Sequence, residues 1–80
     1  FKEFTNIDYV LDEAANIKIE VYDIRGQSVK VLQETYQLPG EYTVKWDGKN
    51  ERGKTVSSGV YYYRITNNNR SVSKELIFIE

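Results

Sequence analysis

Apolar and polar residues alternate along most of this chain, which is the pattern of half-buried β-strands. The alternation is clearest where Ile17, Ile19 and Val21 are separated by Lys18 and Glu20. Further segments with this period are predicted as strands: Thr5–Leu11, Ser28–Tyr36, Tyr42–Trp46, Val60–Ile65 and Val72–Ile79. No segment shows apolar periodicity over the length of a helix. Residues 1–80 are therefore predicted to form one all-β domain.

Turn-forming residues separate these segments. Gly26 follows a short polar stretch and is predicted to adopt a positive φ, which glycine reaches without steric cost. Pro39 and Gly40 stand in the order that a type II turn prefers. Asn67–Arg70 contains three asparagines, which tolerate left-handed backbone and predict a hairpin turn.

The strand predicted at Ser28–Tyr36 is less regular than the others. Val29 and Val31 are expected to point inward, whereas Leu32 interrupts the alternation and indicates a β-bulge. Turns that recur every ~8–12 residues are typical of an antiparallel β-sandwich, here of about seven short strands.

The centre of the chain carries its largest apolar side chains. We expect the core to form around Trp46, Tyr61 and Tyr63, because aromatic side chains bury the most surface. Asp47 and Gly48 end the strand that contains Trp46. Tyr61 lies near the start of a late strand, where sandwiches often place a tyrosine whose hydroxyl bonds back to the backbone.

Composition excludes several classes of function. The chain has no cysteine or histidine, and its 11 basic and 12 acidic residues give a net charge of −1. Disulfides, thiolate chemistry and the usual zinc ligands are excluded, no serine has an evident base, and we predict neither an enzyme nor a bound cofactor. No basic footprint for nucleic acid and no apolar run of transmembrane length is present.

Two surface features have both a simple and a functional interpretation. The loop Asp47–Glu51 only loosely resembles a calcium loop, and Lys49 and Arg52 would repel a cation, so a turn is favoured and no metal is predicted. Exposed tyrosines could stack on sugar rings, but nothing in the sequence places Tyr22, Tyr36 and Tyr62 on one plane. Tyrosines at the wet edges of a small sandwich are the preferred explanation.

The last predicted strand has a stronger basis for binding. Its residues Leu76, Ile77, Phe78 and Ile79 are apolar on both faces, although one face of a two-sheet sandwich should be wet. Either a neighbouring domain of the parent chain covers the second face, or the strand lies at a sheet edge where another chain can add. Self-association through strand edges is a third possibility.

Five spaced motifs resemble one known family. They are IKIEVYDIRG at Ile17–Gly26, YQLPGEY at Tyr36–Tyr42, WDG at Trp46–Gly48 followed by Gly53, SGVYYYRI beginning with Ser58 and Gly59, and KELIFIE at Lys74–Glu80. Together they resemble the type A sorting domain of the type IX (Por) secretion system. This domain is related to the Ig-like domain of the flagellar hook-capping protein.

The resemblance implies an immunoglobulin-like fold and a non-catalytic role. It implies that the chain, which starts just inside the family's opening motif, is the C-terminal module of a larger secreted bacterial protein at the cell surface. The outer-membrane secretion machinery would recognise the last strand, through Lys74, Leu76, Ile77, Phe78, Ile79 and Glu80. The residues Trp46, Asp47, Gly48, Gly53, Gly59, Tyr61 and Tyr63 would hold the fold. The alternatives are a structural or adhesive module, a sugar-binding module and a domain of a hook-cap scaffold.

Overall fold

The computed structural model describes residues 2–79, which form six antiparallel strands and no helix. The strands are β1 (Thr5–Leu11), β2 (Ala15–Asp23), β3 (Ser28–Gln37), β4 (Gly40–Trp46), β5 (Gly59–Asn67) and β6 (Arg70–Phe78). They confirm every segment predicted from the alternation, although β4 begins two residues earlier than expected, β5 ends two residues later, and β6 begins two residues earlier and ends at Phe78.

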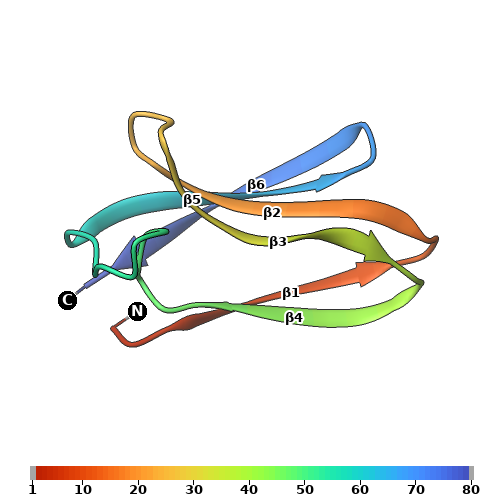
Figure 1. The fold of residues 1–80 in the computed structure, drawn as a ribbon, viewed down its shortest axis with the longest axis horizontal. Coiled ribbons are helices and arrows are strands. Elements are labelled where there is room, and N and C mark those ends of the chain that lie inside the picture. The colour runs from red at the N-terminus through yellow and green to blue at the C-terminus, as the bar shows by residue number, and fades with distance from the viewer. Residues whose placement is uncertain (1, 80) are drawn as a thin grey trace.

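The strands form two packed sheets (Figure 1). β1 pairs with β4, while the larger sheet has the order β3-β2-β5-β6. This is the Ig-like sandwich that was predicted, but within residues 2–79 it has six strands rather than about seven. The chain between β4 and β5 supplies only the isolated bridge between Lys49 and Thr55, because this segment turns back on itself at Gly53.

The core lies between the two sheets and contains the aromatic residues that were predicted to form it. Trp46 has no exposed surface, and Tyr61 and Tyr63 are buried. The Trp46 ring lies edge-on to Tyr61 at 5.3 Å between centroids, and 6.1 Å from Phe78. The aliphatic part of the core comes mainly from one face of β2 and from β1: Ile7, Leu11, Ala15, Ile17, Ile19 and Val21.

The register of β3 explains its irregular sequence. Ile19 pairs with Gln33 and Glu20 with Val31, so Leu32 is the extra residue of a bulge, as its position indicated. A second register shift, between Val21 and Tyr22, leaves Val29 without a paired residue on β2. Because a bulge changes which residues face inward, Val29 and Leu32 pack against the core. The prediction that Val31 points inward is wrong, since it pairs with Glu20 on the outer face.

Two of the three turns predicted from the sequence have the expected structure. Asp23 accepts backbone hydrogen bonds from Arg25 and Gln27, both at 2.9 Å, in the β2–β3 turn. Asn68 takes the left-handed backbone expected of the β5–β6 hairpin, with a φ of 55°. The type II turn at Pro39–Gly40 is wrong, because the φ of Gly40 is 155° whereas that turn needs about +80°. Gly40 instead pairs with Leu11 as the first residue of β4.

Candidate partner-binding surface

The last strand, β6, lies at the edge of the four-stranded sheet, with β5 as its single neighbour there. Its two faces differ sharply at its C-terminal end. Phe78 is 2% exposed and belongs to the core, while Ile77 is 55% exposed. Leu76 is half-buried and Ile79, just beyond the strand, is also exposed. The doubly apolar strand therefore lies at a sheet edge, and no other part of residues 2–79 covers its outer face at Ile77.

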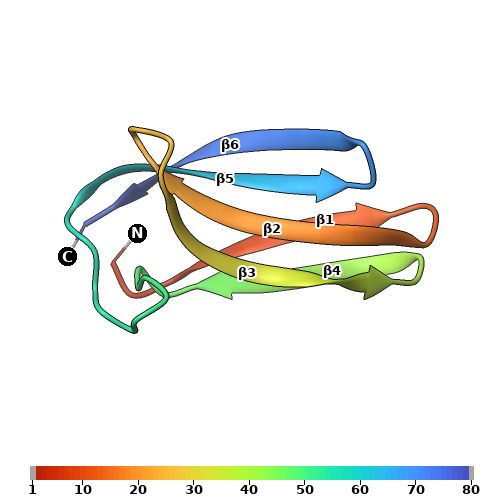
Figure 2. The same ribbon diagram turned by 45° about the horizontal axis from the view of Figure 1, so that its top comes forward.

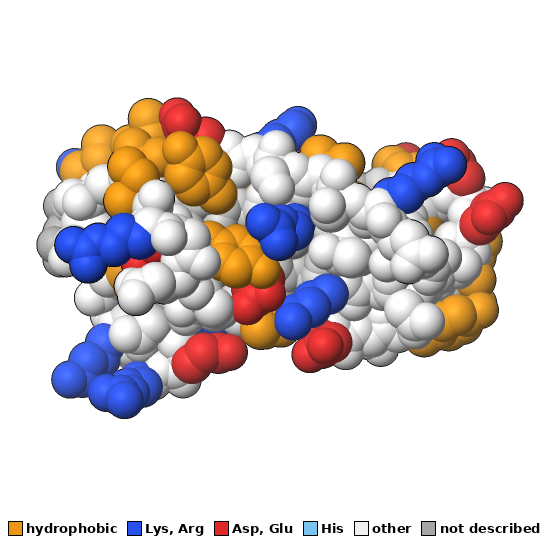
Figure 3. All heavy atoms as spheres, turned by 90° about the horizontal axis from the view of Figure 1, so that it is seen from above, with side chains coloured by type: hydrophobic (Ala, Val, Ile, Leu, Met, Phe, Trp, Pro, Cys, Tyr) orange, Lys and Arg blue, Asp and Glu red, His pale blue; other side chains and the backbone are white. Residues whose placement is uncertain are grey.

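The exposed end of β6 continues into an apolar area on β5. Ile77 pairs directly with Val60, and Tyr62, two residues along β5 on the same face, pairs with Glu75. We call the residues Val60, Tyr62 and Ile77, with the adjoining Ile79, the outer patch. Figure 3 shows a large group of hydrophobic side chains over one end of this face, and smaller hydrophobic areas among polar and charged side chains over the rest of it. The sequence did not single out Val60, because only the strand register reveals that it lies beside Ile77.

A close contact with Gly48 fixes β6 from the inside. Gly48 has a φ of 74°, and a Cβ built there would lie 2.6 Å from Cε1 of Phe78. The neighbouring residues keep this loop in place: Trp46 Nε1 donates to the Lys49 carbonyl at 3.0 Å, and Asp47 accepts from the Lys49 amide at 3.2 Å. The Phe78 ring therefore packs directly against Gly48 of the Trp46–Gly48 motif.

The remaining residues of the expected structural motif occupy the loop and the start of β5. The Tyr61 hydroxyl donates to the Ser57 carbonyl at 2.7 Å, four residues upstream, which is the bond expected of a tyrosine corner. Gly53 closes the loop by donating its amide to the Asn50 carbonyl at 2.9 Å, and Gly59 begins β5. Tyr63 lies on the inner face of β5, where burial raises its pKa and the charge of Asp8 raises it further.

The loop that loosely resembled a calcium site uses its oxygens for backbone bonds. The Asn50 side-chain oxygen accepts from the amides of Arg52 and Lys54, at 3.0 and 3.1 Å. Across residues 2–79, no group of three or more acidic residues, histidines or cysteines comes together in a way that could hold a metal ion. The bonds that Asn50 accepts, with the bond from the Lys49 amide to Asp47, form the turn that the sequence favoured.

The three tyrosines considered for sugar stacking do not share one platform. Tyr22 and Tyr62 are paired neighbours on the outer face, but Tyr36 pairs with Asn16 at the opposite end of the sheet. The Tyr22 ring also lies under the Arg64 guanidinium, with 4.9 Å between the guanidinium carbon and the ring centroid. A flat surface made of three rings is therefore absent.

Next to Tyr22, the structure shows a polar network that the sequence did not suggest. Glu20 accepts hydrogen bonds from the hydroxyls of Tyr22 and Ser28 and forms an ion pair with Lys18 at 3.5 Å. Partial burial opposes the charge of Glu20, but these partners outweigh it and lower its pKa. The hydrogen bond to Glu20, followed by burial, raises the pKa of Tyr22. The spacing of Glu20 and Tyr22 on one face of β2 was the available signal.

Other expected binding residues lie apart from the outer patch. Lys74 faces the inner side of β6, because it pairs with Tyr63, and it is exposed there. Glu80 lies outside the described residues. Among residues 2–79 we find no helix that is long and apolar enough to cross a membrane. The residues proposed for recognition therefore lie on both faces of β6, with Lys74 on the inner face and Ile77 on the outer face.

Comparisons with known proteins agree with the fold. C5a peptidases from Streptococcus pyogenes serotypes M18 and M1 are each 32% identical to the chain over 80 aligned positions, which cover 75% of it. The crystal structure of FlgD from P. aeruginosa superimposes with a TM-score of 0.72 over 94% of the chain, at 22% identity. The chain spans only 7% of each peptidase and 58% of that FlgD chain. The FlgD Ig-like domain family matches residues 2–71, and the chain belongs to this family.

Proposed function

We propose that this domain is a non-catalytic module of a larger bacterial protein, outside the cell or on its surface, and that its last strand directs secretion. In this proposal the outer-membrane machinery of type IX secretion recognises the folded module at the outer patch. The observation that carries the proposal is the two-sided build of β6, since Phe78 anchors the strand while Ile77 and Ile79 remain exposed.

A docking role suits this surface for physical reasons. Large apolar side chains grouped on a protein surface are a common mark of interaction sites. An edge strand also offers unpaired backbone groups to a partner. The outer patch combines both features in one place, and the resemblance of KELIFIE to the sorting family points to the same strand.

A secretion assay tests the sorting role. A soluble periplasmic reporter is fused to residues 1–80 in a bacterium that has the type IX machinery, and surface delivery is measured. Ile77→Glu with Ile79→Glu should abolish delivery. The matched control is Ser71→Glu with Ser73→Glu, which places the same charges on the same face of β6 away from the outer patch.

The interpretation depends on both variants remaining folded, which circular dichroism and Trp46 fluorescence can establish. Deleting β6 is unsuitable, because it would remove Phe78 from the core. Unchanged delivery of the folded Ile77→Glu, Ile79→Glu variant would refute recognition at the outer patch.

A structural module is the second candidate. The chain spans only small parts of the C5a peptidases and about half of the FlgD chain, so related domains occur within longer proteins. In that case the outer patch would pack against a neighbouring domain of the same parent chain. Two results would support this role. The reporter would not reach the surface when fused to the native domain or to either variant. In the parent protein, Ile77→Glu would lower the melting temperature of the adjacent domain.

A further inference from the structure

The two sheets of the sandwich differ in width, and this leaves part of β6 uncovered on its inner side. The larger sheet has four strands and the smaller has two. On one side the sandwich is closed, because β3 and β4 approach each other (Figure 2). On the other side β1 ends the smaller sheet, and nothing in residues 2–79 pairs with its outer edge. Ig-like sandwiches commonly have three strands in the smaller sheet.

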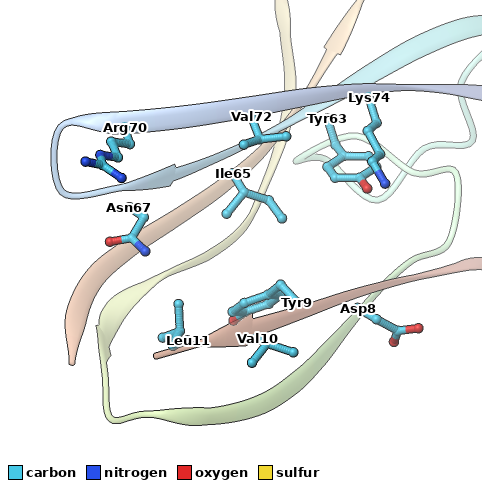
Figure 4. A pocket seen from close by; sticks show the side chains of 10 residues that line it. All are labelled: Asp8, Tyr9, Val10, Leu11, Tyr63, Ile65, Asn67, Arg70, Val72 and Lys74. Atoms are coloured by element: carbon cyan, nitrogen blue, oxygen red, sulfur yellow. The ribbon is translucent and has the colours of Figure 1, made fainter. Parts of the chain in front are cut away.

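A groove runs along this open side, between β1 and the inner face of β5 and β6 (Figure 4). It encloses about 350 Å³. Val72 points to the inner side yet is 60% exposed, and Tyr9, on the inner face of β1, lines the opposite side of the groove. Ile65 on β5, the direct partner of Val72, also lines the groove. An apolar wall beside a free strand edge is the arrangement used for strand addition.

Charges at the two ends of the groove indicate what would fill it. Lys74 and Arg70 lie on the same face of β6 as Val72, about 14 Å apart at the usual rise of a strand. Neither forms an ion pair within residues 2–79. Asp8 lines the Lys74 end, but one of its oxygens already accepts a hydrogen bond from Thr43, 2.6 Å away. At the other end Asp12 and Glu13 line a hollow beside Arg70 without forming an ion pair with it.

We propose that an extended segment of a partner protein adds to the free edge of β1 as a third strand and lies in this groove. Its inward side chains are apolar opposite Val72 and acidic opposite Lys74 and Arg70, a pattern of acidic and apolar residues at every second position. The segment covers Val72 and Ile65 and pairs its backbone with β1. This surface is separate from the outer patch, because it lies on the opposite face of β6.

A second copy of this domain fits the groove less well. Two copies of β1 joined edge to edge in antiparallel fashion, symmetric about the strand's middle residue, would place Asp8 opposite Asp8. Like charges that face each other across paired strands destabilise the pairing. A segment of different sequence avoids this repulsion.

The test uses a synthetic peptide, TETVTET, which presents glutamate, valine and glutamate on one face and reads the same in both directions. It is titrated into the ¹⁵N-labelled domain and followed by amide chemical shifts. Binding should shift β1 and residues 70–74 of β6, with a Kd on the order of a millimolar because the strand is short and its ion pairs are exposed. The charge-reversed peptide TKTVTKT should bind at least threefold more weakly.

Variants decide whether the groove charges matter. Lys74→Glu with Arg70→Glu should reverse the preference, so that TKTVTKT binds better than TETVTET. Lys54→Glu, an exposed change in the β4–β5 loop, is the matched charge control and should keep the native preference. Any of three results would overturn the proposal: no binding of either peptide, shifts confined to the outer patch or to β3, or concentration-dependent dimers that shift β1 without peptide.

Discussion

Gly48 offers the sharpest test of how the loop and the last strand hold together. Replacing it with alanine has two separate costs. The φ of 74° is left-handed backbone, which costs an L-residue about 1–2 kcal/mol. The added Cβ would also lie 2.6 and 2.7 Å from two carbons of the Phe78 ring, and overpacking of this kind typically costs about 1–3 kcal/mol. Together these terms predict that Gly48→Ala lowers the free energy of unfolding by about 2–5 kcal/mol.

Gly53 provides a matched control in the same loop. Its φ is 78°, close to that of Gly48, but nothing lies within 4 Å of a Cβ built there. Gly53→Ala should therefore show the backbone cost alone, about 1–2 kcal/mol. The entropy that alanine removes from the unfolded chain is the same in both variants and cancels in the comparison.

Urea unfolding followed by Trp46 fluorescence measures both variants. Gly48→Ala should be less stable than Gly53→Ala by about 1–3 kcal/mol, the packing term. A background of Phe78→Leu, which has a smaller side chain at the contact, should reduce that difference. Equal destabilisation by the two glycine substitutions would refute the close packing of the Phe78 ring against Gly48.

Further predictions follow from other contacts. Trp46→Ala should lower the free energy of unfolding by about 3–5 kcal/mol in urea titrations, the usual range for a buried aromatic residue, and a loss under about 1 kcal/mol would contradict its place in the core. Tyr61→Phe should cost about 0.5–1.5 kcal/mol, the net value of a typical hydrogen bond, because Ser57 is exposed and water can reach its carbonyl; no change in the melting midpoint would show that water replaces the bond completely. The lowered pKa of Glu20 adds stability above the ordinary carboxyl pKa that is lost as the pH falls through the folded pKa, so Glu20→Gln should flatten the acid limb of the stability profile. The raised pKa of Tyr22 acts in the opposite sense: its contribution is complete below pH 10 and lost as the pH rises further, so Tyr22→Phe should lower stability at neutral pH and flatten the alkaline limb of the same profile.

The sequence could predict the strands and the core because both depend on local periodicity and on a few large side chains. Ile17, Ile19 and Val21 alternate without interruption, and all three are buried. Trp46 has no competitor in size, so its central place followed directly. The bulge at Leu32 was also visible, because one residue broke an otherwise regular period.

Features that depend on long-range pairing were not predictable in the same way. The second bulge reverses the expected direction of Val31, and nothing near it in the sequence signals this. The turn predicted at Gly40 is absent because Gly40 pairs with Leu11 and is the first residue of β4. Predicting the outer patch requires the strand register, which places Val60 beside Ile77. Predicting the groove requires the strand order, in which β1 is the last strand of the smaller sheet on that side.

The anchoring of β6 limits how any partner can recognise it. Pulling the strand out of its sheet would remove Phe78 from its contact with Trp46, a loss comparable to truncating a buried aromatic residue, about 3–5 kcal/mol. That is a large share of the roughly 5–15 kcal/mol that stabilises a small domain. A receptor is therefore expected to bind β6 in place, on the surfaces that remain accessible in the folded domain. Because Ile77 and Lys74 point to opposite faces, substitutions at these two positions can separate one such surface from the other without unfolding the module.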